Sequence, residues 1–422
     1  MRQNVNVILL WLYFGLIILI YGFSIILIQS IKAEPIVKDP LLKIEQIVDR
    51  LSSPTSMAFV DSQNILVLEK NSGEVRLVSN GELKSEPILK LDIDSTTATC
   101  CRGLVGIAVD KDNSEGSKAV FLYFTAASDN NIQALNKLVK YTWDGRNLVN
   151  PQIMLVLPAT PGPNHPGGEV VLDTQGNLYT VIGDLNNEGI LQNIEDSKEV
   201  TDSSVILKIN GLDGSALSSN PFLSIKNEYS RSQVKKYYGY GIRNSFGLAI
   251  DPVTGNLWDT ENMDKDYDEI NLINPGFNSG WKQLMGPIAK SSITQKDLVT
   301  LSGSYYGDPV FSWEPSRGVT DIEFFNSNNF GLDYKNNVFV GDINNGNLYY
   351  FKVNTNRTGF EFESADIETD RVANEDEKDK LAWGMGFDGF TDLETGPDGN
   401  LYVLSFDESS NGDGKIYRII SN

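Results

Sequence analysis

The sequence contains very little histidine and cysteine. Its 422 residues include one histidine, His165, and two cysteines, the neighbours Cys100 and Cys101. Two adjacent thiols without further cysteines or a nearby histidine do not supply the tetrahedral ligand set of a zinc site. The ordinary pKa of an imidazole, about 6.5, lies near neutral pH, so proton chemistry at that pH points first to His165. The alternative is a surface histidine without a function.

Positive charge is also scarce. The chain has 35 Lys and Arg against 56 Asp and Glu, which gives a formal net charge of −21. Such a charge repels nucleic acid and anionic membrane surfaces, so we expect no nucleic-acid partner. The acidic residues are spread along the chain without a long block of one sign, which argues against an acidic tail.

One long apolar run stands near the N-terminus. No charged residue occurs from Val7 to Ile28. A run of about 20 such residues can span a bilayer as a helix, whereas the core of a signal peptide has about 7–15. We therefore expect a flank at 1–6, a transmembrane anchor at 7–29 and a linker at 30–43. The anchor is favoured over a cleaved signal peptide. The rest of the chain is then extracytoplasmic, where a vicinal disulfide between the two cysteines is favoured over free thiols.

Beyond residue 40 the sequence repeats one strand pattern and contains no long amphipathic helix. A turn that ends in Asn precedes an alternating apolar strand five times, and a sixth strand lacks the Asn. Each strand is followed by a second one, and the six predicted pairs are 65–68 with 74–78, 119–125 with 137–143, 178–182 with 204–209, 257–258 with 269–273, 338–340 with 347–353 and 401–404 with 415–419. Six repeats of a four-stranded antiparallel unit predict an all-β, six-bladed β-propeller at residues 44–422. A pair of β-sandwiches is the alternative.

Three loops carry residues suited to chemistry. Gly167 and Gly168 leave space beside the imidazole of His165, so a ligand can approach the backbone closely. Arg243 presents a planar fork that suits a carboxylate or a phosphate, and Asn244 can both donate and accept hydrogen bonds. The acidic loop at 261–269 offers the oxygen ligands that Ca²⁺ prefers. Solvated turn charges and a structural ion pair of Arg243 are the alternatives.

Five motifs in one order resemble the glucose/sorbosone dehydrogenase family, the soluble quinoprotein aldose dehydrogenases. They lie at 103–108, 165–168, 241–244, 261–271 and 392–404, and the resemblance covers about residues 45–420. The resemblance implies a six-bladed propeller that binds pyrroloquinoline quinone (PQQ) and Ca²⁺ on its axial face. It also implies a quinoprotein sugar dehydrogenase that converts an aldose to a lactone and passes electrons to an external acceptor.

The resemblance also implies roles for individual residues. His165 matches the general base, which takes the proton of the anomeric hydroxyl while hydride leaves for the quinone. Asp184 matches a carboxylate that orients this imidazole. The implied cofactor contacts are Arg243, Asn244, Cys101 and Arg102, and the implied calcium ligands are Met263, Asp264, Asp268 and Glu269.

The sequence departs from the family pattern at the calcium loop and at three cationic positions. The loop reads Glu261-Asn262-Met263-Asp264, without the usual Gly-Pro turn, and the cationic positions hold Asn344, Gly389 and Thr391. Because PQQ carries three carboxylates, each lost cation is expected to weaken its binding by about 1.5–3 kcal/mol. The candidate substitutes are Arg102, Arg317 and Lys282.

Two other functions remain open at this point. The missing cations favour a non-enzymatic propeller that binds carbohydrate or protein. The acidic loop favours a calcium-dependent lactonase, which would need no quinone.

Overall fold

The structure is a computed structural model that describes residues 34–95, 102–110, 118–127, 133–196, 200–225, 233–263, 265–407 and 413–422. Residues 36–422 form one compact unit. The predicted anchor at 7–29, the two cysteines and Asp264 lie outside the described residues, so the predictions made for them stay predictions. Within the described part, no helix has the length and apolar character needed to cross a membrane.

The strands of the described residues form six sheets, here numbered in chain order. Sheet 1 contains β3 (Pro54–Phe59), β4 (Asn64–Glu69), β5 (Glu74–Ser79), β6 (Glu82–Leu83) and β7 (Leu89–Lys90). Sheet 2 contains β8 (Leu104–Val109), β9 (Lys118–Ala126), β10 (Leu135–Trp143) and β11 (Leu148–Pro158). Sheet 3 contains β12 (Val170–Leu172), β13 (Asn177–Ile182), β14 (Val205–Asn210), β15 (Tyr237–Tyr240), β19 (Phe277–Asn278) and β20 (Tyr305–Tyr306).

The other three sheets come from the second half of the chain and its N-terminal strands. Sheet 4 contains β16 (Ser245–Ile250), β17 (Leu257–Asn262), β18 (Asp268–Ile273), β21 (Phe311–Trp313) and β26 (Val372–Ala373). Sheet 5 contains β22 (Val319–Phe324), β23 (Val338–Asp342), β24 (Leu348–Val353), β25 (Phe360–Glu361), β27 (Ala382–Met385) and β1 (Ile36–Val37). Sheet 6 contains β28 (Gly389–Thr395), β29 (Leu401–Phe406), β30 (Asp413–Ser421) and β2 (Leu42–Ser52). Among the described residues, helix is limited to the short segments α2 (Ala365–Asp370), α3 (Lys378–Leu381), η1 (Ile190–Gln192), η3 (Val234–Lys236), η4 (Ile288–Lys290) and η5 (Gln295–Asp297).

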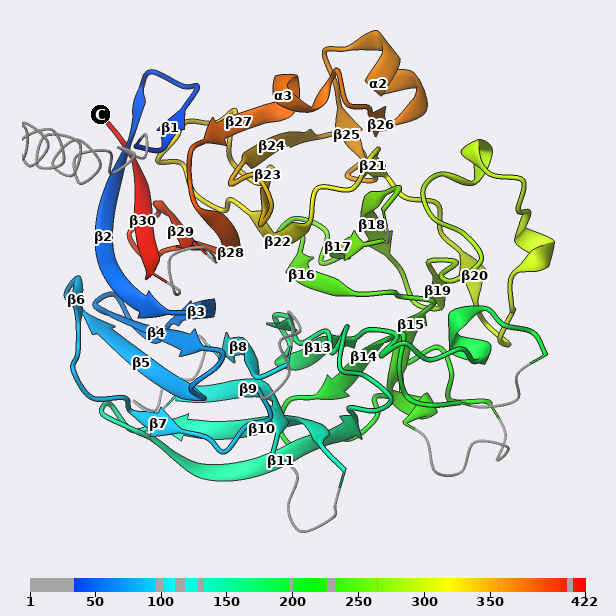
Figure 1. Cartoon of the computed structure of the whole chain (residues 1–422), viewed down its shortest axis with the longest axis horizontal. Helices are drawn as coiled ribbons and strands as arrows, with labels where there is room; N and C mark the ends of the chain where they lie inside the picture. Colours follow the sequence, from blue (N-terminus) through cyan, green and yellow to red (C-terminus); the bar gives the residue numbers. More distant parts are fainter. Residues whose placement is uncertain are drawn as a thin grey trace, which may run out of the picture. The chain divides into compact units, whose positions relative to one another are not determined.

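The sheets stand around a common axis (Figure 1). The innermost strand of each sheet contacts that of the next, and the cycle closes in the order β3, β8, β12, β16, β22, β28 and back to β3. This arrangement is a β-propeller, and the prediction of an all-β propeller is confirmed. Radial packing leaves only short edges exposed, which limits unwanted strand pairing.

All six predicted strand pairs form antiparallel pairs at the centre of their sheets. They are β4 with β5, β9 with β10, β13 with β14, β17 with β18, β23 with β24 and β29 with β30.

The recurring turn before these strands has a physical basis. Asp173 Oδ1 accepts the backbone N–H groups of Gln175 and Asn177, both at 2.9 Å, and Asn177 Nδ2 donates to Asp173 Oδ2 at 2.9 Å. Asp61 and Asn64 repeat the arrangement before β4. Such side-chain bonds to the backbone stabilise the turn that starts each strand.

The two ends of the compact unit meet in sheet 6. β2, near the N-terminus, pairs with the C-terminal strand β30 from Leu42 opposite Ser421 to Ser52 opposite Asp413. β1 pairs with β27 of sheet 5, so the compact unit begins at Ile36, within the predicted linker.

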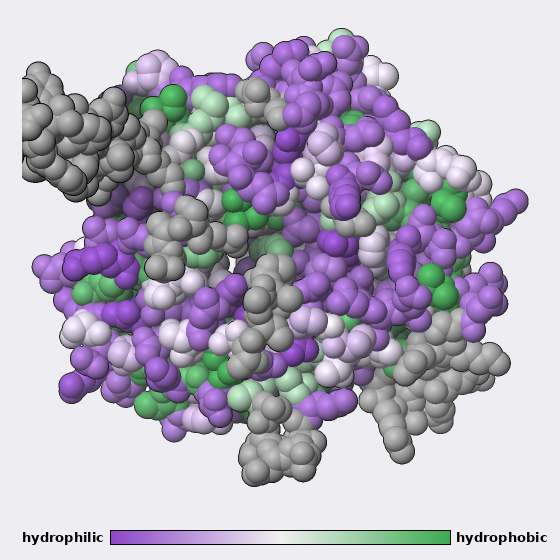
Figure 2. Space-filling view, viewed as in Figure 1, coloured by the Kyte–Doolittle hydropathy of each residue, from purple (hydrophilic) through white to green (hydrophobic). Residues whose placement is uncertain are grey.

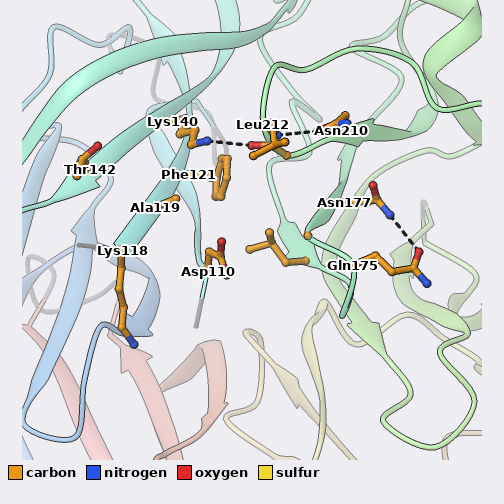
Figure 3. A pocket seen from close by; sticks show the side chains of 13 residues that line it. Asp110, Lys118, Ala119, Phe121, Lys140, Thr142, Gln175, Asn177, Asn210 and Leu212 are labelled. Carbon is orange, nitrogen blue, oxygen red and sulfur yellow. Dashed lines mark hydrogen bonds between the residues drawn. The ribbon is translucent and has the colours of Figure 1, made fainter. Parts of the chain in front are cut away.

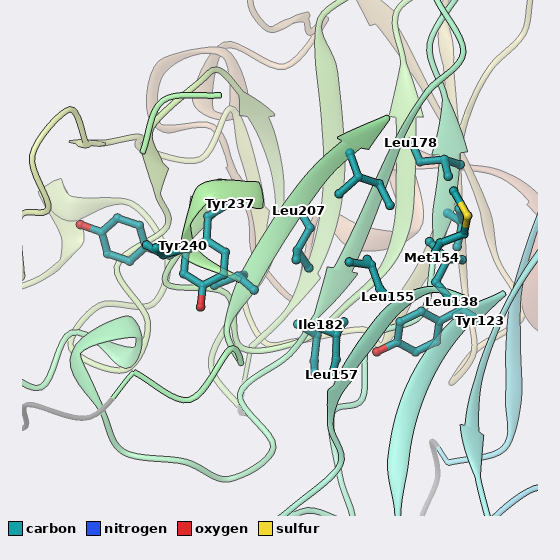
Figure 4. Packing of buried hydrophobic residues seen from close by; sticks show 14 of the residues in the cluster. Tyr123, Leu138, Met154, Leu155, Leu157, Leu178, Ile182, Leu207, Tyr237 and Tyr240 are labelled. Atoms are coloured by element: carbon teal, nitrogen blue, oxygen red, sulfur yellow. The ribbon is translucent and has the colours of Figure 1, made fainter. Parts of the chain in front are cut away.

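Hydrophobic side chains fill the spaces between neighbouring sheets. Figure 4 shows the cluster between sheets 2 and 3, where Leu138, Leu155 and Leu178 pack with Ile182 and Tyr123. By contrast, the face of the protein seen in Figure 2 is mostly hydrophilic, with scattered hydrophobic residues. The polar surface and the apolar contacts between sheets are those expected of a folded domain that faces water.

Three carboxyl groups from different sheets interact where the innermost strands surround the axis. Burial raises the pKa of Asp392, on β28, to about 8, and the charge of Glu394 adds to the rise. Burial and the charge of Asp392 also raise the pKa of Asp321 on β22 and of Glu169, which precedes β12. A hydrogen bond joins the carboxyls of Asp321 and Asp392, and Asp321 Oδ2 accepts the N–H of Leu393 at 3.0 Å. We name these three residues the axial carboxyls.

The axial carboxyls are expected to make the protein less stable as the pH rises. A carboxyl whose pKa is higher in the folded than in the unfolded protein stabilises the fold while protonated, and that stability is lost as the pH rises through the folded pKa, here about 8 for Asp392. The free energy of unfolding, measured by urea denaturation, should therefore fall as the pH rises from about 4, the ordinary pKa of a carboxyl in the unfolded chain, to about 8. Asp321→Asn mimics the protonated carboxyl and should flatten this fall.

A matched control is Asp376→Asn, which removes one negative charge at an exposed position. This variant should leave the pH dependence of the free energy of unfolding unchanged. An equal pH dependence in the wild type and in Asp321→Asn would contradict the prediction.

Candidate active site

The loop that carries His165 is packed against sheet 2. It joins β11 to β12, and the φ angle of His165 is 58°, in the left-handed region. Tyr123, buried on β9, donates its hydroxyl to the carbonyl of Pro166 at 2.9 Å. A Cβ on Gly106 of β8 would lie 1.8 Å from the carbonyl oxygen of Gly168, so this position admits no side chain. Sheet 2 thus fixes the loop at Pro166 and Gly168, directly after His165.

His165 is paired with Asp184, which follows the end of β13. Its Nδ1 lies 2.6 Å from Asp184 Oδ1, and the same oxygen accepts the N–H of Asn186 at 2.9 Å. Trp281 Nε1 donates to the other oxygen, Oδ2, at 2.9 Å. An ionised carboxylate only accepts hydrogen bonds, so the neutral imidazole donates from Nδ1 and keeps Nε2 as its acceptor atom.

The second predicted loop lies directly beside this pair. The backbone N–H of Asp184 donates to the carbonyl of Arg243 at 2.8 Å, and the N–H of Gly167 donates to Asn244 Oδ1 at 3.3 Å. The guanidinium of Arg243 donates to the carbonyl of Asn262 at 3.0 Å and lies 5.4 Å from the ring centre of Trp281. The structure therefore brings His165, Asp184, Arg243 and Asn244 together.

The third loop is joined to the second by Glu261. Its Oε1 accepts the N–H of Arg243 at 2.7 Å, and its Oε2 accepts the hydroxyl of Ser279 at 2.6 Å. Burial raises the pKa of Glu261, as do the charges of Glu269 and Asp259. The sequence predicted the acidic loop but not this linking role of Glu261.

Two of the predicted calcium ligands, Asp268 and Glu269, point away from each other. Asp268 and Glu269 are successive residues of β18, so their side chains leave opposite faces of the sheet. Asp268 Oδ2 accepts the N–H groups of Arg317, Gly318 and Val319, and its Oδ1 accepts that of Met263 at 3.3 Å. Glu269 Oε1 instead accepts the N–H of Gly286 at 2.7 Å. Among the described residues, no three His, Cys, Asp or Glu side chains are placed to hold one ion.

Burial also raises the pKa values of these acidic groups. The value of Asp268 rises to about 6 and that of Glu269 to about 8. Asp259, on the same face of sheet 4 as Glu269, has a pKa of about 7 from burial. A side-chain hydrogen bond with Asn271 opposes this rise.

The three candidate substitute cations each meet a carboxylate. Arg102 pairs with Asp94 at 2.8 Å, Arg317 with Glu375 at 2.7 Å, and Lys282 with Glu188.

Arg102 contacts the loop of the histidine, and Arg317 lies beside Asn344. Arg102 also donates to the carbonyl of Ala159, in the loop that leads to His165. Arg317 precedes Gly318, where an added Cβ would lie 2.6 Å from the amide of Asn344. Arg317 therefore stands beside one of the positions at which the sequence lacks the expected cation.

A pocket of about 440 Å³ lies elsewhere, between sheets 2 and 3 (Figure 3). Its sheet 3 residues come from the end of β12 and the start of β13, whereas Asp184 follows the end of β13, so the pocket and Asp184 lie at opposite ends of this strand. Lys140 crosses between the two sheets and donates to the carbonyl of Gly211 at 3.2 Å. The lining residues are Asp110, Lys118, Ala119, Phe121, Lys140, Thr142, Leu172, Gln175, Gly176, Asn177, Asn210, Gly211 and Leu212.

The fold and the site define a β-propeller with a histidine–carboxylate pair and an arginine at the meeting point of three loops. The sequence model of the family described as Glucose / Sorbosone dehydrogenase matches residues 51–418. The chain belongs to this family, and the resemblance found in the motifs is confirmed.

Known relatives cover nearly the same length. Aldose sugar dehydrogenase YliI of Escherichia coli strain K12 is 25% identical over 374 residues, which cover 87% of this chain and 91% of that protein. The apo-form structure of the soluble aldose sugar dehydrogenase from Escherichia coli has a TM-score of 0.67 and 24% identity over 90% of this chain and 100% of that chain. The PQQ-bound aldose sugar dehydrogenase from Streptomyces coelicolor has a TM-score of 0.62 and 19% identity over 92% and 100% of the two chains. The likeness to these solved structures supports the fold.

Proposed function

We propose that this protein is a quinoprotein sugar dehydrogenase that oxidises the anomeric carbon of an aldose to a lactone. The observation that carries the proposal is the 2.6 Å contact between His165 Nδ1 and Asp184 Oδ1 beside Arg243. Family membership and the likeness to the aldose sugar dehydrogenase YliI of Escherichia coli support the substrate class. The closed cycle of innermost strands supports a ring of six blades around this site.

His165 acts as the general base in this proposal. With its Nδ1–H donated to Asp184, its Nε2 is free to accept the proton of the anomeric hydroxyl. Asp184 holds the imidazole in this tautomer and stabilises the positive charge that forms on it. PQQ, when bound, supplies a quinone that accepts the hydride from the anomeric carbon and later passes two electrons to an external acceptor.

The described residues fit an anionic cofactor. Arg243 presents a guanidinium against the ring of Trp281, and the buried Nε atoms of Arg102 and Arg317 lack an acceptor among the described residues. Guanidinium groups bind carboxylates through charged hydrogen bonds. The three arginines are therefore the proposed anchors for the carboxylates of PQQ, and Asn244 completes the set.

The described side chains do not form a calcium site. Asp268 is saturated by backbone N–H groups, and Glu269 faces the other side of the sheet. No step of the proposed reaction depends on calcium, and the reconstitution includes the ion so that its effect can be measured. The remaining parts of the proposal are an extracytoplasmic location and an anchor at 7–29, which the uncharged run from Val7 to Ile28 supports.

The test is reconstitution of the full-length chain with PQQ and Ca²⁺, followed by dye reduction with a panel of aldoses. Aldose-dependent dye reduction that requires PQQ would support the proposal, and a parallel sample with a calcium chelator would measure the need for the ion. Absence of both a bound-quinone spectrum and turnover would refute it. Release of acid from lactones without PQQ would support the lactonase instead.

A non-enzymatic propeller that binds carbohydrate or protein is the second candidate. Asn344, Gly389 and Thr391 at the expected cationic positions favour it, because they leave fewer charges for the cofactor. Saturable binding of an aldose without turnover in the same reconstitution would support this function.

Arg243→Gln is expected to weaken the binding of PQQ by about 10- to 100-fold. The variant removes a charged hydrogen-bond donor worth about 1.5–3 kcal/mol, and each 1.4 kcal/mol is about tenfold in affinity. Fluorescence titration of the full-length protein with PQQ measures the change. Arg146→Gln, which removes one positive charge from an exposed turn, should bind PQQ as the wild type does. Equal weakening in both variants would mean that overall charge, and not a contact of Arg243, sets the affinity.

A further inference from the structure

Trp281 is held in place from several sides at the centre of the site. Its backbone N–H donates to the carbonyl of Gly241 at 3.1 Å, and its carbonyl accepts Asn193 Nδ2 at 2.6 Å. The residue is only 7% exposed. Its ring therefore has little freedom to move relative to the loop that carries Arg243.

The indole of Trp281 contacts two functional groups at once. Its Nε1–H donates to Asp184 Oδ2 at 2.9 Å, while its ring lies 5.4 Å from the guanidinium carbon of Arg243. A cation over an indole ring is attracted to its electron-rich face. One side chain thus connects the partner of the proposed base with a proposed cofactor anchor.

The hydrogen bond to Trp281 fixes the plane of the Asp184 carboxylate. Oδ1 accepts from His165 and Asn186, and Oδ2 accepts from Trp281 on the other side. Rotation of the carboxylate would stretch bonds on both oxygens. Without the indole N–H, only the bonds on Oδ1 would oppose that rotation.

We propose that Trp281 is a positioning residue that holds the Asp184–His165 pair in fixed orientation relative to Arg243. This inference rests on the proposed sugar dehydrogenase function. Trp281 touches neither reacting atom of the sugar in this proposal; it acts through Asp184 and Arg243. Removal of a group that orients a functional side chain in this way typically lowers activity by about 10- to 100-fold.

The kinetic test compares Trp281→Phe, Asp184→Asn and the double variant in the PQQ-reconstituted full-length protein. Trp281→Phe keeps an aromatic ring for Arg243 but removes the N–H. It should lower kcat by about 10- to 100-fold with little change in KM. If Trp281 acts through Asp184, the double variant should be no slower than Asp184→Asn alone, whereas independent effects would multiply and overturn the inference.

The matched control is Trp383→Phe. Trp383 is 8% exposed and donates its Nε1–H to the hydroxyl of Tyr334 at 3.2 Å, so the substitution removes a comparable indole bond. Trp383 belongs to a hydrophobic cluster around sheets 5 and 6 rather than to the three site loops. This variant should keep the wild-type kcat, and a loss equal to that of Trp281→Phe would overturn the inference.

A second measurement needs no activity, because the chain has a single histidine. Nitrogen-15 NMR of the imidazole in the apo protein reports which ring nitrogen carries the proton, without any assignment problem. The wild type should show the Nδ1–H tautomer alone, and Trp281→Phe should shift both nitrogen signals toward a mixture of tautomers. Unchanged signals and unchanged kcat in Trp281→Phe would overturn the inference. If the wild type shows no aldose oxidation, the proposed function fails, while the NMR comparison still decides whether Trp281 orients the pair.

Discussion

Replacement of His165 by Asn is expected to lower kcat for aldose oxidation by about 10²- to 10⁴-fold, the usual contribution of a positioned general base. Asn has no atom that can take a proton at neutral pH, so the anomeric hydroxyl would lose its acceptor. Dye reduction by the PQQ-reconstituted variant, at saturating aldose, measures the effect. The chain has no second imidazole to replace the lost one.

Asn is preferred to Ala because of the backbone at this position. The φ angle of His165 is 58°, a region that Asn tolerates better than other side chains with a Cβ. The control is Arg50→Asn. Arg50 is exposed, lies away from the site and has a φ angle of 65°, so this variant also places Asn in the left-handed region. Both variants should keep the thermal midpoint of the wild type. Turnover by His165→Asn at the wild-type rate would remove the proposed base from the mechanism.

Gly183→Ala is expected to separate the loops of the site. An added Cβ would lie 2.5 Å from the carbonyl oxygen of Arg243 and 2.6 Å from that of His165. Both atoms belong to the backbone, so the strain cannot be relieved by rotation of a side chain. A displacement of about 1 Å between base and cofactor anchor can cost about 100-fold in rate, and such overpacking costs about 1–3 kcal/mol of stability.

The control for this prediction is Gly359→Ala. An added Cβ there would meet its nearest atom, Asn354 Nδ2, at 3.5 Å, which is ordinary contact, and neither glycine has a positive φ angle. Gly183→Ala should lower both kcat and the free energy of unfolding, which is measured by urea denaturation. The free energy of unfolding of Gly359→Ala should stay within about 0.5 kcal/mol of the wild-type value. A stable and fully active Gly183→Ala protein would show that the three loops do not depend on this close approach.

The strand pairs were predictable because their signals are local. The Asp and Asn side chains that begin β4 and β13 bond to backbone groups only a few residues away, and the alternating apolar residues that follow show which side of each strand is buried. The innermost strands were not predicted. β12, with three residues, is too short to show a period, and its contacts with β8 and β16 join segments that are distant in the sequence.

The site was predictable in part. The motifs around His165, Asp184 and Arg243 predicted residues that the structure brings together, although their roles remain proposals. Asp268 and Glu269 were grouped as ligands of one ion although adjacent strand residues point to opposite faces. Trp281 lies beyond the acidic loop, in the Gly-rich segment 276–281, but nothing local in the sequence indicates a partner at position 184. The contact forms only when β13 and β19, which are distant in the sequence, join sheet 3.

The pairing of β2 with β30 has a consequence for biosynthesis. Sheet 6 takes its outer strand from the start of the compact unit and its other three strands from the end, so this sheet cannot form until β30 has been synthesised. Until then β2 emerges from the ribosome as a strand without its partner, the condition in which strands pair wrongly with other chains. We therefore expect wrong pairing of β2 with other chains to compete with folding until β30 is available.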